Sequence, residues 1–249
     1  RWRIDIEYEG TSFAGWQVQV DTLTVQGELE RVLGVFLGHP VTVSGAGRTD
    51  SGVHALQQVA SFTTSVSRTP KQVCDGLNSM LPHGIAVREA RVVPDAFHPR
   101  HSPHTKTYRY RILTREARSP LRHKRCWHVG RELDVQCMSE AAQQLVGTHD
   151  FSSFRASSCS ADAPIRTVQA LRVEQVGDEI YIEIEGTGFL QYMVRIIAGS
   201  LVEVGAGRKP PSWLAELLQQ RDRRLAGRTA PPGGLTLRSV EYRENTEGR

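Results

Sequence analysis

The chain opens with an alternation of apolar and polar positions and then changes to a helical period. Over residues 2–8 every second residue is apolar, which is typical of a half-buried strand. From residue 25 the apolar positions recur every three or four residues, so we expect a helix with Thr24 as its N-cap. The apolar positions of this helix are Val25, Leu29, Val32, Leu33 and Phe36.

The remainder of the first half continues to alternate between strand and helix patterns. Strands are expected near residues 41–46, 57–63 and 86–93. Thr69 followed by Pro70 indicates an N-cap with proline at the first helical position. The helix that follows has its apolar residues at Val73, Leu77 and Leu81. The order of the elements is therefore βαββαβ.

The second half repeats this order with insertions. Its expected strands are residues 106–113, 166–176, 179–186 and 235–240, and the pair 166–176 and 179–186 is joined by a turn at Gly177. Its expected helices begin at Asp134, cover residues 193–204, and include an extra one at residues 212–220.

The repeated order predicts an α+β fold made of two ferredoxin-like, or RRM-like, βαββαβ units. We expect their strands to join into one mainly antiparallel sheet with a central cleft. The first unit is expected to cover residues 1–95 and the second residues 96–249.

One glycine-framed loop, residues 45–52 with the letters GAGRTDSG, carries the strongest candidate chemistry. Glycine tolerates positive φ and close approach of a ligand, so Asp50 and Arg48 are expected to point into a cleft. In a dinucleotide-binding G-x-G-x-x-G loop the third glycine would fall at Asp50, where a carboxylate would repel a pyrophosphate. We therefore discard that alternative and favour a nucleophilic carboxylate.

Residues 47–55, with the letters GRTDSGVHA, resemble the G-R-T-D-A-G-V-H-A signature of the TruA family of tRNA pseudouridine synthases, with Ser51 in place of the usual alanine. Further segments resemble family motifs in the same order, namely residues 97–101, 106–110, 147–154 and 189–195. The resemblance covers nearly the whole chain and is greatest to the bacterial enzymes that modify positions 38, 39 and 40 of the anticodon arm.

The resemblance implies an isomerase that converts uridine to pseudouridine in tRNA, without a cofactor and without a metal. Asp50 would be the nucleophile, attacking either C1′ of the ribose or C6 of the uracil. Tyr108 would stack on the uracil and take the C5 proton, directly or through water. Arg195, a charge on an otherwise apolar helix, would pair with Asp50. Arg48 would fill the space left by the extruded uridine or hold its phosphate.

The resemblance also implies residues that bind the tRNA. They are Phe97, His98, Arg100, His101, Arg155, Ser157 and Ser158, with Arg100 as the expected phosphate contact and the last three in a flexible loop. His54 and His149 are expected to be structural, although either could be interpreted as a general base. The family works as a homodimer, so we expect this chain to do the same.

Basic residues dominate the segment between residues 96 and 131, in which Glu116 is the single acid. They are Arg100, Lys106, Arg109, Arg111, Arg115, Arg118, Arg122, Lys124, Arg125 and Arg131. Such a segment favours phosphate binding, all the more because Tyr108, Tyr110 and Trp127 could stack on bases. The alternative is a solvated basic face with no ligand.

Other features limit the function classes. Cys74, Cys126, Cys137 and Cys159 lack C-x-x-C spacing, and prolines interrupt any helix that would align His98, His101 and His104, so we expect no metal site. No apolar run reaches the roughly 20 residues that span a bilayer, so we expect a cytoplasmic protein. Two other functions are weighed, a non-catalytic RNA-binding protein and a carboxylate-dependent hydrolase. The first leaves Asp50 without a purpose, and the second normally needs a paired acid.

Overall fold

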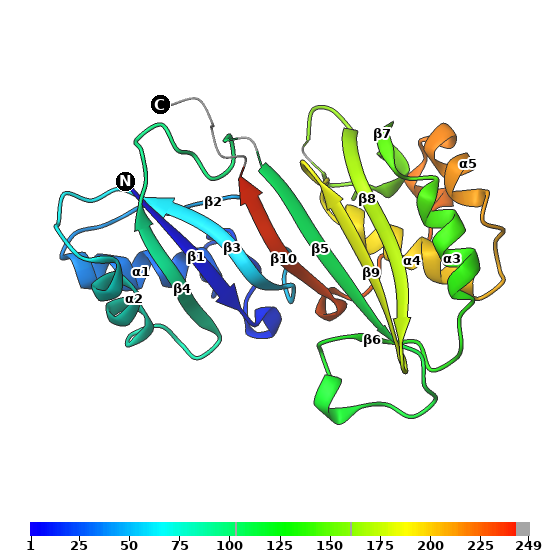
Figure 1. Ribbon diagram of the computed structural model, residues 1–249, viewed down its shortest axis with the longest axis horizontal. Coiled ribbons are helices and arrows are strands. Elements are labelled where there is room, and N and C mark those ends of the chain that lie inside the picture. The colour runs from blue at the N-terminus through cyan, green and yellow to red at the C-terminus, as the bar shows by residue number, and fades with distance from the viewer. Residues whose placement is uncertain (103, 160, 243–249) are drawn as a thin grey trace. The chain divides into compact units, whose positions relative to one another are not determined.

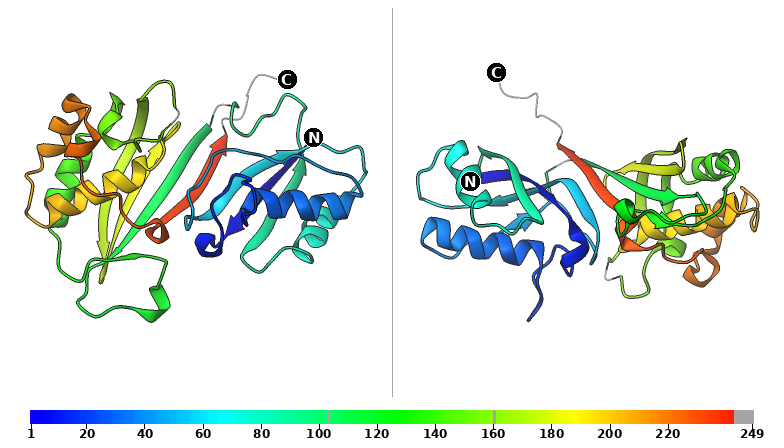
Figure 2. Two further views of the ribbon diagram at one scale, coloured as in Figure 1. Left: turned by 180° about the vertical axis from the view of Figure 1, so that it is seen from behind. Right: turned by 90° about the horizontal axis from the view of Figure 1, so that it is seen from below.

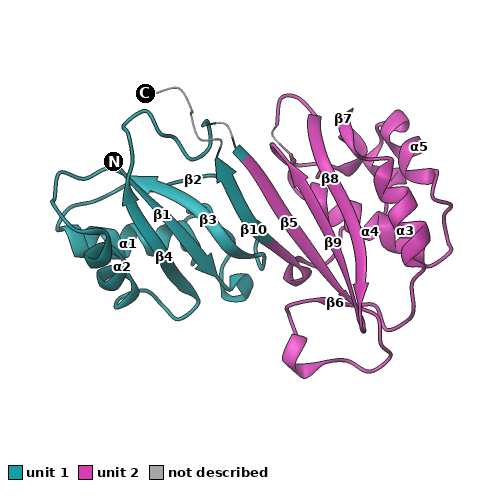
Figure 3. Cartoon of the chain, viewed as in Figure 1, with its two compact units in different colours: residues 1–104, 237–249 teal, residues 105–236 magenta. Residues whose placement is uncertain are grey.

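The computed structural model describes residues 1–102, 104–159 and 161–242, and its elements are shown in Figure 1. The chain divides into two compact units, residues 1–104 with 237–249, and residues 105–236 (Figure 3). We call them unit 1 and unit 2 and describe each by itself.

Unit 1 is built on a layer of paired strands. Its strands are β1 (Trp2–Tyr8), β2 (Ser44–Gly45), β3 (His54–Phe62), β4 (Ile85–Val92) and most of β10 (Leu235–Tyr242). The order is β4-β1-β3-β10, with the two-residue β2 paired to β3. Its helices are α1 (Val25–Leu37) and α2 (Pro70–Asn78). Helix α1 lies on one face of the strands (Figure 2), and α2 packs against α1 and β4.

The predicted helix starts of unit 1 are confirmed. The side chain of Thr24 accepts a hydrogen bond from the Gly27 amide at 3.2 Å and thereby caps α1. At α2, Thr69 and Gln72 form a reciprocal capping box, with Pro70 in the first turn. The expected strand at residues 41–46 is wrong in extent, because only Ser44 and Gly45 pair with β3.

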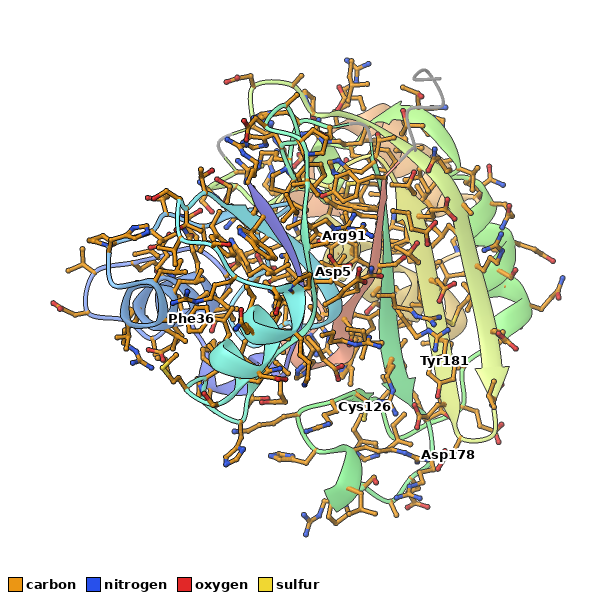
Figure 4. All side chains as sticks on the ribbon, turned by 60° about the vertical axis from the view of Figure 1, so that its left-hand side comes forward. Asp5, Phe36, Arg91, Cys126, Asp178 and Tyr181 are labelled. Atoms are coloured by element: carbon orange, nitrogen blue, oxygen red, sulfur yellow. The ribbon has the colours of Figure 1, made fainter. Side chains whose placement is uncertain are left out.

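Both faces of β1 are buried over most of the strand, although its alternating pattern predicts one exposed face. Arg3 and Asp5 are both buried, at 7% and 6% exposure, so β1 is covered on both sides over most of its length. The two side chains form an ion pair at 2.7 Å, and Gln57 donates to Asp5 at 2.9 Å (Asp5 is labelled in Figure 4). Burial is tolerated here because the two charges are paired and hydrogen-bonded.

Unit 2 has the strand order β5-β9-β8-β7. These strands are β5 (His104–Leu113), β7 (Gly147–Asp150), β8 (Ile165–Val176) and β9 (Glu179–Gly186), and the short β6 (Trp127–His128) is parallel to β5. The helices are α3 (Val135–Gln143), α4 (Met193–Gly205) and α5 (Trp213–Gln220). Helix α3 packs against β8 and α4, and α4 is buried along nearly its whole length, as its apolar sequence predicts.

The chain is therefore α+β with mainly antiparallel strands, as predicted. Along the sequence β1-α1-β2-β3-α2-β4 is followed by β5-α3-β8-β9-α4-β10, so the βαββαβ order occurs twice, with β6, β7 and α5 as additions. The expected central cleft stays a prediction. In the part of the chain that the structure describes, no helix is long and apolar enough to cross a membrane.

The unit boundary lies after residue 104, and the chain's last strand returns to unit 1. Tyr242 explains this grouping, because its ring packs on Phe97 at 5.1 Å and on His104 at 5.4 Å. Its hydroxyl also donates to the Pro99 carbonyl at 2.7 Å. The predicted division into residues 1–95 and 96–249 stays a prediction.

Candidate active site

The loop that carries Asp50 is fixed through its neighbour Thr49. The Thr49 hydroxyl is hydrogen-bonded to the Tyr8 hydroxyl at 2.8 Å, and the Thr49 carbonyl accepts from the Trp16 amide at 3.1 Å. Thr49 is buried, whereas Asp50 is partly exposed. Burial raises the pKa of Tyr8, so this phenol stays protonated and available for the hydrogen bond. The backbone next to Asp50 is therefore held by two hydrogen bonds of Thr49, while Asp50 itself stays partly exposed.

Glycines shape this loop, though not all in the way the sequence predicts. Gly52 has φ of +78°, and Gly15, from the neighbouring segment, has φ of +97°. A Cβ on Gly15 would lie 2.6 Å from the Thr49 carbonyl oxygen, so only glycine fits there. Gly45 does not meet a ligand but the Trp16 indole, which would lie 2.6 Å from an added Cβ. Gly15 is thus a loop-shaping residue that the motif alone does not reveal.

Arg48 and His54 flank Asp50 with different roles. Arg48 is exposed, and its Nε donates to the Gln17 side chain at 3.1 Å. His54 is buried, and its Nδ1 accepts from the Gly10 amide at 3.0 Å with a Glu9 oxygen 3.5 Å away. His54 therefore holds the start of β3 against the segment after β1, in agreement with a structural role.

In unit 2, Tyr108 lies on the buried face of β5 beside an aromatic partner. Its ring meets that of Phe189 edge to face, with centroids 5.2 Å apart and planes at 85°. Phe189 comes from the segment between β9 and α4, and it fixes the orientation of the Tyr108 ring. Phe189 lies in the segment 189–195 that resembles a family motif, but the resemblance implies no role for Phe189.

Arg195 lies in the first turn of α4 with partners that the sequence does not predict. Its Nε donates to the Ala230 carbonyl at 2.8 Å, and its guanidinium lies 4.7 Å from the Tyr192 ring centroid. Tyr192 caps α4 with φ of +62°, a backbone conformation that costs energy in a residue with a side chain. The pairing of Arg195 with Asp50 stays a prediction.

The predicted binding segment at residues 97–101 forms a tight turn. The Nδ1 of His98 accepts from the amides of Arg100 and His101, at 3.1 and 3.3 Å. Phe97 packs on Tyr242, which also belongs to unit 1. Arg100 and His101 are exposed and are the members of this segment that face solvent.

These motifs match those of known proteins over most of the chain. The model of the tRNA pseudouridine synthase family matches residues 5–102 and 141–243, which include Asp50, the 97–101 turn and Arg195. The chain belongs to this family. It is 47% identical to tRNA pseudouridine synthase A of Myxococcus xanthus over 250 residues, covering 100% of this chain and 94% of that protein. It is 45% identical to tRNA pseudouridine synthase A of Geotalea uraniireducens, covering 96% and 98%.

The predictions of family and of enzyme class, an isomerase acting on tRNA, are thereby confirmed. A solved structure, a Cbf5-Nop10-Gar1 complex, contains a chain with 11% identity and a TM-score of 0.31, covering 80% of this chain and 54% of that one. At this score the likeness carries no argument about fold or function.

Several basic residues of the segment between residues 96 and 131 form ion pairs within the chain. Within it, Arg109 pairs with Glu183 at 3.0 Å and Arg111 with Glu179 at 2.9 Å. Arg122 meets Glu179 at 2.7 Å as well as Asp178. These acids lie on β9 and the turn before it, where Asp178 is labelled in Figure 4.

Other basic residues of the segment are exposed, and several of them lie in the loop between β5 and α3. Arg118 and Arg125 are exposed there, whereas Lys106 is buried at 8% exposure. The acids of these ion pairs come from residues 178–183, more than fifty positions later, and phosphate binding by the basic segment stays a prediction.

The remaining tRNA-binding residues of the family motif lie after β7. Ser157 and Ser158 are exposed and Arg155 is partly buried. The Ala156 amide donates to the Gln191 carbonyl at 3.0 Å, and Ser158 lies 3.5 Å from the Gln191 side chain. This segment is therefore tied to the residues that precede α4, close in sequence to Tyr192.

The structure gives no support for a metal centre among the residues it describes, where no three histidine, cysteine or acidic side chains gather as a metal site would require. The four cysteines, Cys74, Cys126, Cys137 and Cys159, are free thiols. His149, the other candidate base, is hydrogen-bonded to the Val146 carbonyl at 2.9 Å and packs on Phe151.

Proposed function

We propose that this chain isomerises uridines 38, 39 and 40 in the anticodon arm of tRNA, with Asp50 as the nucleophile. The observation that carries the proposal is the Asp50 loop, in which Thr49 is held by two hydrogen bonds and Asp50 is left partly exposed. A fixed backbone with a partly exposed aspartate suits a nucleophile, because little reorganisation is needed when the substrate arrives.

The reaction needs no oxidant or external group. The N1–C1′ bond of uridine breaks and a C5–C1′ bond forms, while a proton leaves C5 and another is gained at N1. Asp50 attacks C1′ or C6, and either route ends with the carboxylate regenerated. The uridine has to leave its stack before it reaches Asp50, at a cost of a few kcal/mol.

Residues of unit 2 are proposed to complete the chemistry. Tyr108 stacks on the uracil and accepts the C5 proton at its hydroxyl, directly or through a water molecule. Phe189 supports this role, because the edge-to-face contact sets the ring plane of Tyr108. Arg195 is proposed to hold the Asp50 carboxylate, with its orientation set by Ala230.

The tRNA is proposed to be held by side chains around these groups. They are Arg48, Phe97, His98, Arg100, His101, Arg155, Ser157 and Ser158. Arg100 and His101 are exposed on a turn that His98 shapes, which supports phosphate contact there. Arg48 is proposed either to occupy the space that the extruded uridine leaves or to hold its phosphate.

We also propose a homodimer in which one tRNA lies across both subunits. The ion-paired state of Arg109, Arg111 and Arg122 supports this, because what remains of one chain's basic segment is small for an L-shaped polyanion. We propose that the reaction takes place in the cytoplasm, where tRNA is made and used.

The experiment that tests the proposal maps pseudouridine at nucleotide resolution. Unmodified tRNA transcripts with a single uridine at position 38, 39 or 40 are incubated with the purified protein, beside a transcript with none of the three. Pseudouridine is expected at each of the three positions and absent from the fourth transcript. Modification confined to another part of the tRNA would contradict the proposed site, and sedimentation with and without tRNA tests the dimer.

A further inference from the structure

An exposed apolar hairpin stands next to the Asp50 loop in unit 1. It comprises residues 17–23, and its three apolar side chains Val18, Val20 and Leu23 are 44%, 87% and 49% exposed. Scattered single apolar residues on a surface need no explanation, but three within seven residues form a patch. Asp21 is the only charged residue of the hairpin.

The hairpin is built to present these side chains. Gln19 and Thr22 form an isolated antiparallel bridge, and the Thr22 hydroxyl donates to the Val20 carbonyl at 2.8 Å. Asp21 adopts φ of +50°, which reverses the chain at the tip. The Gln19 side chain donates to the Ala14 carbonyl at 3.0 Å. Val20 is therefore held at the end of a hydrogen-bonded turn rather than left on a loose loop.

The start of the hairpin is attached to the loop that carries Asp50, and its end is attached to the segment before the hairpin. At its start, Gln17 accepts from Arg48 at 3.1 Å, and the preceding Trp16 donates to Thr49. At its end, the Leu23 carbonyl accepts from the Ala14 amide at 2.9 Å. The apolar tip thus extends from the same backbone framework as Asp50 and Arg48.

We propose that Val18, Val20 and Leu23 form an apolar wedge that contacts nucleobases of the tRNA beside the extruded uridine. The inference rests on the proposed function of Asp50. Extrusion of a nucleotide opens a gap in the stack, and apolar side chains inserted between bases offset the lost stacking. Arg48 at the root of the hairpin supplies the nearby positive charge for the backbone phosphate.

The negative charge at the hairpin tip indicates which part of the RNA the hairpin contacts. A carboxylate at the tip repels phosphate, whereas it accepts hydrogen bonds from the exocyclic amino groups of bases. A tip with three apolar side chains and Asp21 therefore suits base edges and faces, and not the backbone. Its attachment to the Asp50 loop places the wedge beside the substrate and favours RNA over a second copy of this chain as its occupant.

The test replaces Val20 by serine and uses Val35→Ser as the matched control. Val35 is a 67% exposed valine on α1 that takes no part in the proposed site. Val20→Ser is expected to weaken tRNA binding about threefold to tenfold, since a side chain that is buried on binding is lost. The slope of log Kd against log salt should stay unchanged, because no phosphate contact is removed. Val35→Ser should match the parent protein.

Two results would overturn the wedge. One is a Val20→Ser affinity equal to that of Val35→Ser at equal thermal stability, and the other is conversion of a dimer to a monomer by Val20→Ser, which would assign the tip to a second copy. Binding is measured in the Asp50→Asn background as well, where no chemistry is needed. A loss of affinity there supports the wedge even if Asp50 proves not to be the nucleophile, so the two failures are distinguishable.

Discussion

Arg195 and Ala230 exchange two hydrogen bonds, one from the arginine Nε to the Ala230 carbonyl at 2.8 Å and one from the Ala230 amide to the Arg195 carbonyl at 3.1 Å. The segment that contains Ala230 can approach α4 because Gly199 faces it. A Cβ on Gly199 would lie 1.8 Å from the Arg228 carbonyl oxygen. The orientation of a proposed active-site residue therefore depends on a glycine one turn further along the helix.

Gly199→Ala should consequently lose stability and activity together. The added methyl group forces residues 227–231 away from α4, and overpacking of this kind costs about 1–3 kcal/mol. Gly34→Ala on α1 is the matched control, because its Cβ meets nothing closer than 3.8 Å and alanine is the better helix former. Thermal unfolding and pseudouridine yield measure both effects. A Gly199→Ala protein as stable and active as Gly34→Ala would show that the close approach is not required.

Substitution of Arg122 should lower stability, whereas substitution of Arg125 should weaken tRNA binding. Arg122→Gln removes a partner of Glu179, whose side chain is 5% exposed, so the melting temperature should fall. Arg125→Gln removes an exposed cation, so it should leave the melting temperature unchanged and reduce the salt slope of tRNA binding by about one. Equal melting temperatures for the two variants would contradict the ion-pair account.

His98 should make the protein less stable in mild acid. Burial, then the neighbouring His101, Arg1 and Arg100, lower the pKa of His98 below the ordinary value of 6.5. Between the two pKa values the unfolded chain binds more protons, so stability present above pH ~6.5 is lost as the pH falls. His98→Asn keeps a hydrogen-bond acceptor without titrating.

Melting temperatures at pH 7.5 and pH 5 check this expectation. The parent protein should lose more than His98→Asn between the two values. An exposed histidine of unit 2 provides the control, because His123→Asn should leave the drop as it is in the parent. The same drop in all three proteins would exclude His98 as its source.

The sequence predicts helix starts well because the signals are local. Thr24 and Thr69 are predicted as N-caps, and a helix is predicted to begin at Asp134. Each of the three accepts a hydrogen bond from an amide three residues later. Asp50 is identified as a candidate nucleophile in the same way, because its motif consists of residues adjacent in sequence. Family resemblance then supplies the roles that spacing alone leaves open.

Interactions between distant residues are not predictable in this way. Arg111 and Glu179 are 68 positions apart, and Arg195 and Ala230 are 35 apart. A charge count over a window of sequence treats Arg111 as available for phosphate, because the window does not contain its partner. For the same reason the Trp16 indole that fills the space beside Gly45 is visible only in the folded chain.

The proposed pairing of Arg195 with Asp50 can be measured by a double-mutant cycle. Arg195→Met alone should lower stability, because Asp50 then lacks the guanidinium as its partner. Since both residues are partly exposed, the loss should be smaller than the roughly 3–5 kcal/mol of a fully buried pair. Arg195→Met with Asp50→Asn should regain much of that stability and none of the activity. Additive losses, with no coupling between the two positions, would show that the residues do not touch.

Asp50→Asn tests the central claim most directly. The pseudouridine formed in unmodified tRNA is compared for the parent protein, Asp50→Asn and Asp95→Asn, an exposed acid of unit 1 whose side chain is 92% exposed. The parent and Asp95→Asn should modify the tRNA equally. Asp50→Asn should form none, with tRNA affinity kept or improved because an anion is removed from a polyanion-binding site. Turnover by Asp50→Asn above the level of a no-enzyme blank would contradict the assignment of Asp50 as the nucleophile.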